Sequence, residues 1–110
     1  MRLRDRVTVL RGVPVPGPYG TQEPDWTVPE QVTYPAEVQP IVKPSEEALV
    51  NQDRTRTILR AFLPAMVDLQ TTDRVVWAGS TYEVDGTPKH WYRGGRPHHV
   101  EVLLLRTVGG

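Results

Sequence analysis

The chain has 110 residues, of which 38% are hydrophobic and 7% aromatic, with a formal net charge of zero and no cysteine. This length predicts one domain, residues 1–110, and the lack of cysteine excludes a disulfide framework and a thiolate metal site. No apolar run approaches the roughly 18 residues of a membrane span. The N-terminal MRLRDR also lacks a signal-peptide core. We therefore expect synthesis in the cytoplasm and no membrane partner.

The first segments in chain order predict a strand followed by a long loop. Residues 4–10 alternate, with Val7 and Val9 on one face, which is typical of a half-buried strand. Residues 13–32 are expected to form a Pro-rich loop, because eight of the 11 prolines lie between positions 14 and 44 and proline cannot donate to a strand ladder. A loop of this length inside a small domain is commonly functional.

Two further strands are predicted on either side of a second loop. Residues 34–42 predict a strand that Pro35 and Pro40 either place at a sheet edge or interrupt. Residues 43–53 lack β character and are expected to connect it to the next strand. Residues 54–63 fit both helical spacing and an alternating strand. We favour a strand there, because Thr55, Thr57 and Ile58 are β-branched and Pro64 ends the run.

The stretch 73–106 predicts three more strands and organises the rest of the chain. Residues 74–78 form a short apolar run, residues 81–85 alternate, and residues 98–107 carry apolar side chains on both faces. Turns are expected at 78–80 and at Asp85-Gly86. The expected core residues on these strands are Val75, Trp77, Tyr82, Val84 and Val102. The chain is thus predicted to be an all-β, single-domain barrel of about six strands, of SH3-like or OB-like size, with two long loops in its N-terminal half.

No residue pattern indicates catalysis, a cofactor or a metal. His98 and His99 are adjacent and would point to opposite faces of a strand, so at most one of them could join His90 at a metal. Ser45 and Ser80 lie in an expected loop and an expected turn, outside any nucleophile elbow. We therefore expect no catalytic, cofactor-binding or metal-ligating residues.

Aromatic residues outside the predicted strands are candidate contacts with other molecules. Tyr19, Asp25 and Trp26 stand out in the first loop, where Trp26 either folds back onto the barrel or anchors the chain to another protein. Trp91, Arg93 and Arg96 combine an aromatic ring with arginines near two glycines. That combination could stack on single-stranded nucleic acid or simply form an exposed hairpin.

The order of these signals resembles one protein family. The segment DRVVWAGSTYEVDGTPKHW, followed by VEVLLLR, is similar to the end of head-to-tail stopper, or head-closure, proteins of long-tailed bacteriophages. The AEVQP at 36–40 and the YG and DW pairs of the first loop also look like that family. The resemblance covers most of the chain, from about residue 6 to residue 106.

The resemblance implies a non-enzymatic β-barrel that forms a homo-oligomeric ring, expected to be twelve-fold, in the virion neck. The ring would contact a portal-adaptor protein above and a tail terminator or tail tube below, with genomic double-stranded DNA passing through it without sequence specificity. The loop 43–53 would form the channel gate, with candidate residues Lys43, Glu46, Glu47, Leu49, Asn51 and Asp53. Two alternatives stand beside this interpretation: a neighbouring neck or tail-terminator ring protein, and a cellular nucleic-acid-binding barrel.

Overall fold

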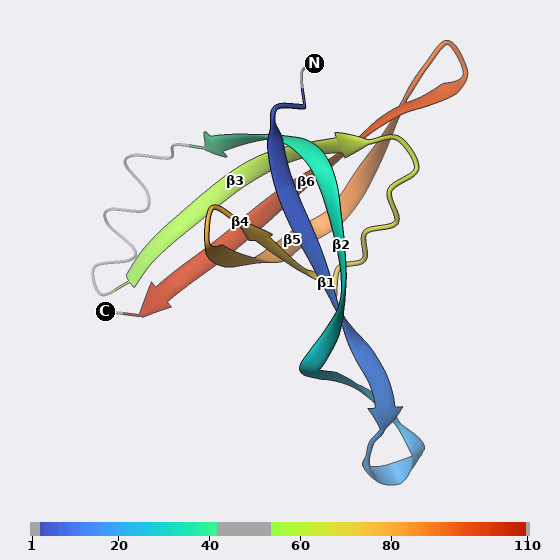
Figure 1. Ribbon diagram of the computed structural model, residues 1–110, viewed down its shortest axis with the longest axis vertical. Helices are drawn as coiled ribbons and strands as arrows, with labels where there is room; N and C mark the ends of the chain where they lie inside the picture. The colour runs from blue at the N-terminus through green and yellow to red at the C-terminus, as the bar shows by residue number, and fades with distance from the viewer. Residues whose placement is uncertain (1–2, 42–53, 110) are drawn as a thin grey trace.

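Six antiparallel strands close into a barrel in the part of the chain that the computed structural model describes, residues 3–41 and 54–109 with side chains at 3–41 and 57–106. In chain order they are β1 (Asp5–Pro16), β2 (Gln22–Ile41), β3 (Arg54–Pro64), β4 (Arg74–Trp77), β5 (Ser80–Arg93) and β6 (Arg96–Gly109). Around the barrel the order is β1-β2-β3-β6-β5-β4, and β4 pairs with β1 to close it (Figure 1). The prediction of an all-β, six-stranded barrel is confirmed.

The interior of the barrel is filled by small and branched side chains that alternate along the strands. Val100, Val102 and Leu104 of β6 are buried opposite the buried Leu59, Ala61 and Leu63 of β3. Residues 54–64 therefore form a strand, as the β-branched pattern predicted, and not a helix. Of the predicted core residues, Val75, Tyr82 and Val102 are buried, while Trp77 and Val84 are partly buried and pack against the same cluster.

The expectation of a Pro-rich loop over 13–32 is wrong, because most of this segment is strand. β1 continues to Pro16, a short 3₁₀ turn, η1 (Pro18–Gly20), reverses the chain, and β2 begins at Gln22. Beyond residue 10, β1 pairs only with β2 among the described residues, so each strand of this ribbon has one free edge. Proline is tolerated at such edges, since its missing N–H can face solvent.

The expected turn at Asp85-Gly86 is also wrong. β5 runs through it to Arg93, and Gly86, with φ of +83°, lies in a bulge between the pairs Asp85–Leu103 and Lys89–Glu101. A glycine at positive φ serves a bulge as well as a turn. The turns at Ala78-Gly79 and at Gly94-Gly95, each with two residues at positive φ, do reverse the chain.

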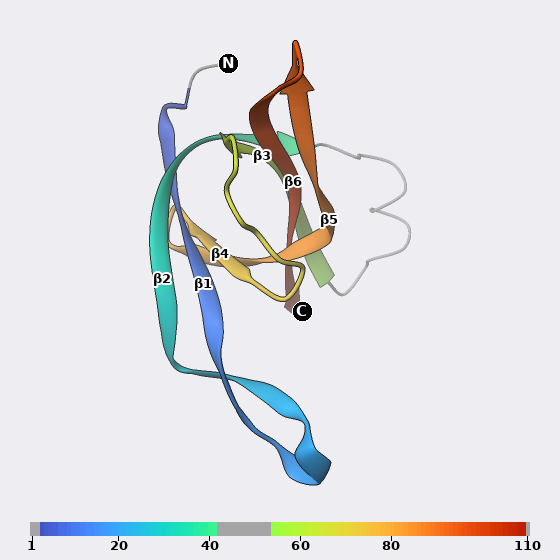
Figure 2. The same ribbon diagram turned by 90° about the vertical axis from the view of Figure 1, so that its right-hand side faces the viewer.

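Two hairpins project from the barrel and give the molecule its shape. The β1–β2 arm, residues 12–32, extends from one end, and the β5–β6 arm, residues 86–99, extends from the opposite end (Figures 1 and 2). The principal extents are 45 × 44 × 23 Å. Among the described residues there is no helix of the length and hydropathy needed to cross a bilayer. The loop expected at 43–53 lies outside the described residues.

Candidate functional site: two projecting arms

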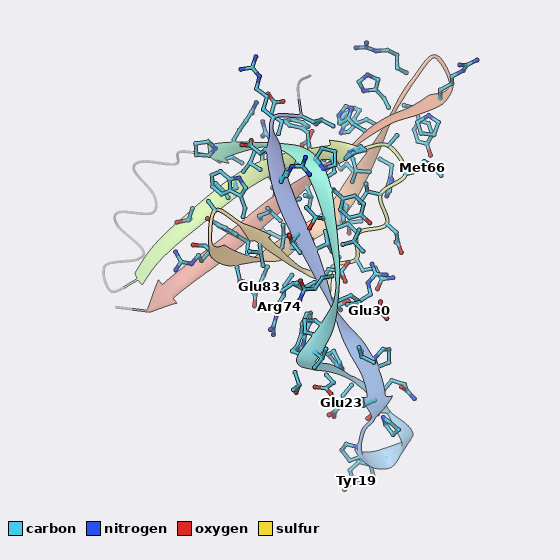
Figure 3. All side chains as sticks on the ribbon, in the orientation of Figure 1. Tyr19, Glu23, Glu30, Met66, Arg74 and Glu83 are labelled. Carbon is cyan, nitrogen blue, oxygen red and sulfur yellow. The ribbon has the colours of Figure 1, made fainter. Side chains whose placement is uncertain are left out.

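The tip of the β1–β2 arm is a compact turn that holds Tyr19 outward. The Gly17 N–H donates to the Thr21 carbonyl at 2.6 Å, and the Thr21 hydroxyl donates to the Pro18 carbonyl at 2.8 Å. Tyr19 takes a left-handed conformation, with φ of 63° and ψ of 28°, and its side chain is fully exposed. Figure 3 shows it at the far end of the arm. A non-glycine residue rarely adopts this conformation, so the turn fixes an aromatic ring in solvent at some conformational cost.

The root of the same arm is anchored to the barrel by Trp26. The β1–β2 register shifts between Arg11 and Val13, so that residues 26–29 of β2 form a bulge opposite Gly12. The half-buried ring of Trp26 lies in this bulge, with the Arg74 guanidinium carbon of β4 3.9 Å from the ring centroid. A cation over an aromatic face is attractive. Trp26 therefore lies at the root and Tyr19 at the tip, although the sequence grouped them together.

Asp25 has a local role in that bulge. Its carboxylate accepts a hydrogen bond from the Thr27 N–H at 3.0 Å, and this bond lowers the pKa of Asp25 below its ordinary value. On the other strand, a Cβ added at Gly12 would lie 2.6 Å from the Cβ of Pro24. Only glycine therefore allows the two strands of the arm to approach this closely.

An ion pair between the half-buried Arg11 and the buried Asp73 secures β1 where the arm leaves the barrel. Arg11 donates from Nε and Nη2 to the two carboxylate oxygens of Asp73, each at 2.9 Å, and contacts Asp68 at 3.3 Å. The bond to Asp73 raises the pKa of the Arg11 guanidinium. Sequence reasoning missed this pair. Nothing in the local sequence around Asp73 indicates that its partner is Arg11.

The β5–β6 arm carries a stack of rings near its base. Trp91 and His99 are cross-strand partners whose rings are nearly parallel, 16° apart, with centroids 6.1 Å apart. Phe62 of β3 packs edge-on against His99 at 5.7 Å. The outer side chains stay accessible, since Trp91 is 47% and Tyr92 is 62% exposed. Cross-strand aromatic pairs of this kind stiffen a two-stranded ribbon.

His98 and His99 touch although their residues are adjacent. Their Nδ1 atoms are 2.7 Å apart, so one must donate and the other accept. Burial, and then the charge of His98, lower the pKa of His99, while Glu101 acts in the opposite direction. Among the described residues, no group of three His, Asp or Glu side chains is arranged to hold a metal ion.

The predicted contact residues thus divide between the two arms. The β1–β2 arm carries Tyr19, Asp25 and Trp26. The β5–β6 arm carries Trp91, Arg93 and Arg96, and the two arginines are cross-strand neighbours on either side of the Gly94-Gly95 turn. The gate candidates Lys43, Glu46, Glu47, Leu49, Asn51 and Asp53 lie outside the described residues. Arms of this kind on a small rigid barrel are suited to contacts with other proteins.

The sequence matches the model of one family, described as phage head completion protein, over residues 1–103. The chain belongs to this family. The description of the family is that of proteins that complete the head of a phage particle. This agrees with the resemblance to phage neck proteins seen in the sequence.

Two individual proteins are also similar to this phage head completion protein. An uncharacterized protein, YqbH of Bacillus subtilis (strain 168), is 32% identical over 65 residues, which are 56% of this chain and 50% of the relative. The match therefore spans half the length of that relative. The solved structure of protein xkdH of the phage-like element PBSX from Bacillus subtilis is 16% identical, with a TM-score of 0.45, covering 93% of this chain and 92% of that one.

Proposed function

We propose that this phage head completion protein is a head-to-tail stopper. Its copies form a ring in the virion neck, below the portal and its adaptor, that closes the DNA exit after packaging and offers the surface on which the tail docks. The family membership supports a place between head and tail. The observation that carries the proposal further is the pair of arms at opposite ends of a rigid barrel (Figures 1 and 2).

The arms suit a subunit that must reach several neighbours at once. A barrel fixes their roots, because β1 is held by Arg11 and Asp73 and the base of the β5–β6 arm by Phe62 and His99. Exposed aromatic side chains such as Tyr19 and Tyr92 are typical of protein interfaces. The expected neighbours are further copies in a twelve-fold ring, the adaptor above, and a tail terminator or tail tube below.

Genomic DNA would pass through such a ring without sequence readout. The net charge of the chain is zero, which does not favour tight retention of phosphates by the whole surface. The cellular nucleic-acid-binding alternative depended on Trp91 as a stacking platform. In the structure one face of Trp91 is taken by His99, which leaves less of the ring for a base. In the remaining alternative, the chain is a neighbouring neck protein or a tail terminator and forms a different ring between head and tail.

The phenotype of a phage that lacks the gene distinguishes a stopper from a tail terminator. Without a stopper, packaged heads should release DNA and carry no tails, and the wild-type chain supplied from a plasmid should restore both. Electron microscopy and nuclease protection of the packaged DNA measure the two defects, and a cryo-EM map of the complemented neck places the ring. Heads that keep their DNA, beside tails of irregular length, would instead indicate a tail terminator.

A further inference from the structure

The two arms carry opposite charges. The β1–β2 arm has three carboxylates and no lysine or arginine, and the β5–β6 arm has three cations and no carboxylate. The carboxylates are Glu23, Asp25 and Glu30, and the cations are Lys89, Arg93 and Arg96.

Among the described side chains, the charges of the two arms form no ion pair, although Asp25 accepts a hydrogen bond from the Thr27 N–H of its own arm. Within residues 3–41 and 57–106, the ion pairs join Arg11 to Asp68 and Asp73, and Arg60 to Glu101, and none involves a charge of either arm. Figure 3 shows Glu23 along the β1–β2 arm and Glu30 at its root, and both residues are exposed. The charges that define each arm are therefore available to a partner.

One copy cannot bring its own arms together, because they project from opposite ends of the barrel in both views (Figures 1 and 2). We propose that the β1–β2 arm of one copy docks on the β5–β6 arm of the next copy. The inference deepens the proposed ring and depends on it. Two different surfaces that meet in this way form a heterologous contact, and such contacts repeat around an axis until they close a ring.

Apolar groups accompany the charges on both arms. The β1–β2 arm exposes Tyr19, Val28 and Val32, and the β5–β6 arm exposes Trp91 and Tyr92. Aromatic anchors surrounded by complementary charges are the usual composition of a specific interface. The charges select the pairing and orient it, and the aromatic and branched side chains exclude water. Two other occupants would suit the basic β5–β6 arm, namely DNA and a different virion protein, and the experiment separates them.

Cross-linking in assembled particles tests the contact, and because this chain has no cysteine of its own, the unsubstituted chain gives no multimers. The chain with both Gln22→Cys and Pro97→Cys, one exposed position on each arm, is supplied to a phage lacking the gene and treated with a flexible bis-maleimide. Docking of the β1–β2 arm of one copy on the β5–β6 arm of the next gives a ladder of multimers of this chain, whereas each single-cysteine chain gives none. Dimers alone, or no multimers, would overturn the inference.

Charge exchange on the same double-cysteine chain tests the complementarity. We expect Arg93→Glu with Arg96→Glu, or Glu23→Arg with Glu30→Arg, to reduce the ladder by about tenfold or more, since close charge pairs across interfaces couple strongly. All four substitutions together should restore it. The matched controls Arg6→Glu and Glu83→Arg, which reverse exposed charges outside the arms, should leave it unchanged. An unchanged ladder after reversal, or no recovery after exchange, would rule out pairing between the arms.

The products also separate this inference from the proposed function. A cross-link from Pro97→Cys to another virion protein, or protection of that position by DNA, would assign the β5–β6 arm to that occupant. That result would leave the proposed stopper function intact and would contradict the docking of one arm on the other. Particles that contain no copies of the chain in the neck would refute the proposed stopper and this contact together.

Discussion

Arg11 of β1 and Asp73, which precedes β4, form a two-point ion pair in which Nε donates to Oδ1 and Nη2 to Oδ2, each at 2.9 Å. The Asp73 side chain is 0% exposed and also accepts the Gln70 N–H at 2.8 Å. The pair joins segments 62 residues apart, at the point where the β1–β2 arm leaves the barrel.

We predict that Arg11→Ala destabilises the fold by about 3 kcal/mol, because it leaves a buried carboxylate with its backbone donor but without a cation. Urea unfolding of the purified chain measures the change. Arg6→Ala is the matched control, since Arg6 is an exposed arginine on the same strand, and it should cost less than about 0.5 kcal/mol. Equal midpoints for the two variants would show that the ion pair contributes little.

Gly12→Ala should destabilise the fold by about 1–3 kcal/mol and disturb the β1–β2 arm, because the new Cβ would meet Pro24 at 2.6 Å. Trp26 lies 3.1 Å from the same point, so its fluorescence should change as well. The neighbouring Val13→Ala removes an exposed side chain and serves as the control. If Gly12→Ala unfolds like the wild type with unchanged emission, the strands are not as close as described.

Tyr82 and Trp77 should differ in their contribution to stability. Tyr82 is only 5% exposed within the core, whereas Trp77 is partly buried and its ring tilts against Tyr82 at 6.5 Å between centroids. Tyr82→Ala is expected to cost about 3–5 kcal/mol, and Trp77→Ala clearly less. Denaturant melts of both, with Tyr82→Phe as the ring-retaining control, check the order. The reverse order would contradict the burial described.

Acidification should weaken the fold through His99. Its pKa is lowered from the ordinary 6.5, first by burial and then by His98, with Arg93 acting the same way and Glu101 opposing. The unfolded chain then binds more protons, so stability is present above about pH 6.5 and is lost as the pH falls towards the folded pKa. Unfolding midpoints between about pH 5 and 7 should therefore depend less on pH in His99→Gln. The control is His90→Gln, which changes an exposed histidine on the same arm. If the unfolding midpoint of His99→Gln depends on pH as strongly as that of the wild type, His99 is not the source of the pH dependence.

The barrel strands could be predicted because each buries one face of a short alternating segment. Leu59, Ala61 and Leu63 show the pattern directly, and a helix would have placed them around its circumference. The same reasoning identified Val75, Tyr82 and Val102, whose neighbours in sequence point outward.

The arms were harder to predict because their stability does not come from a buried face. Proline argues against a central strand but not against a ribbon with free edges, and Gly86 fits a bulge and a turn equally well. The ion pair of Arg11 with Asp73 was invisible for a different reason. It joins residues that only the closed barrel brings together, and no local spacing encodes such a pairing.

The prolines of the β1–β2 arm also decide how other chains can meet it. An isolated ribbon is a template for added strands, and strand addition between identical copies leads to fibres. Pro14 and Pro16 on β1, with Pro24 and Pro29 on β2, withhold backbone donors at short intervals along this ribbon. The arm can therefore extend into solvent at high protein concentration without recruiting strands at random. Side-chain contacts, and not backbone hydrogen bonds, therefore select the partners of this arm.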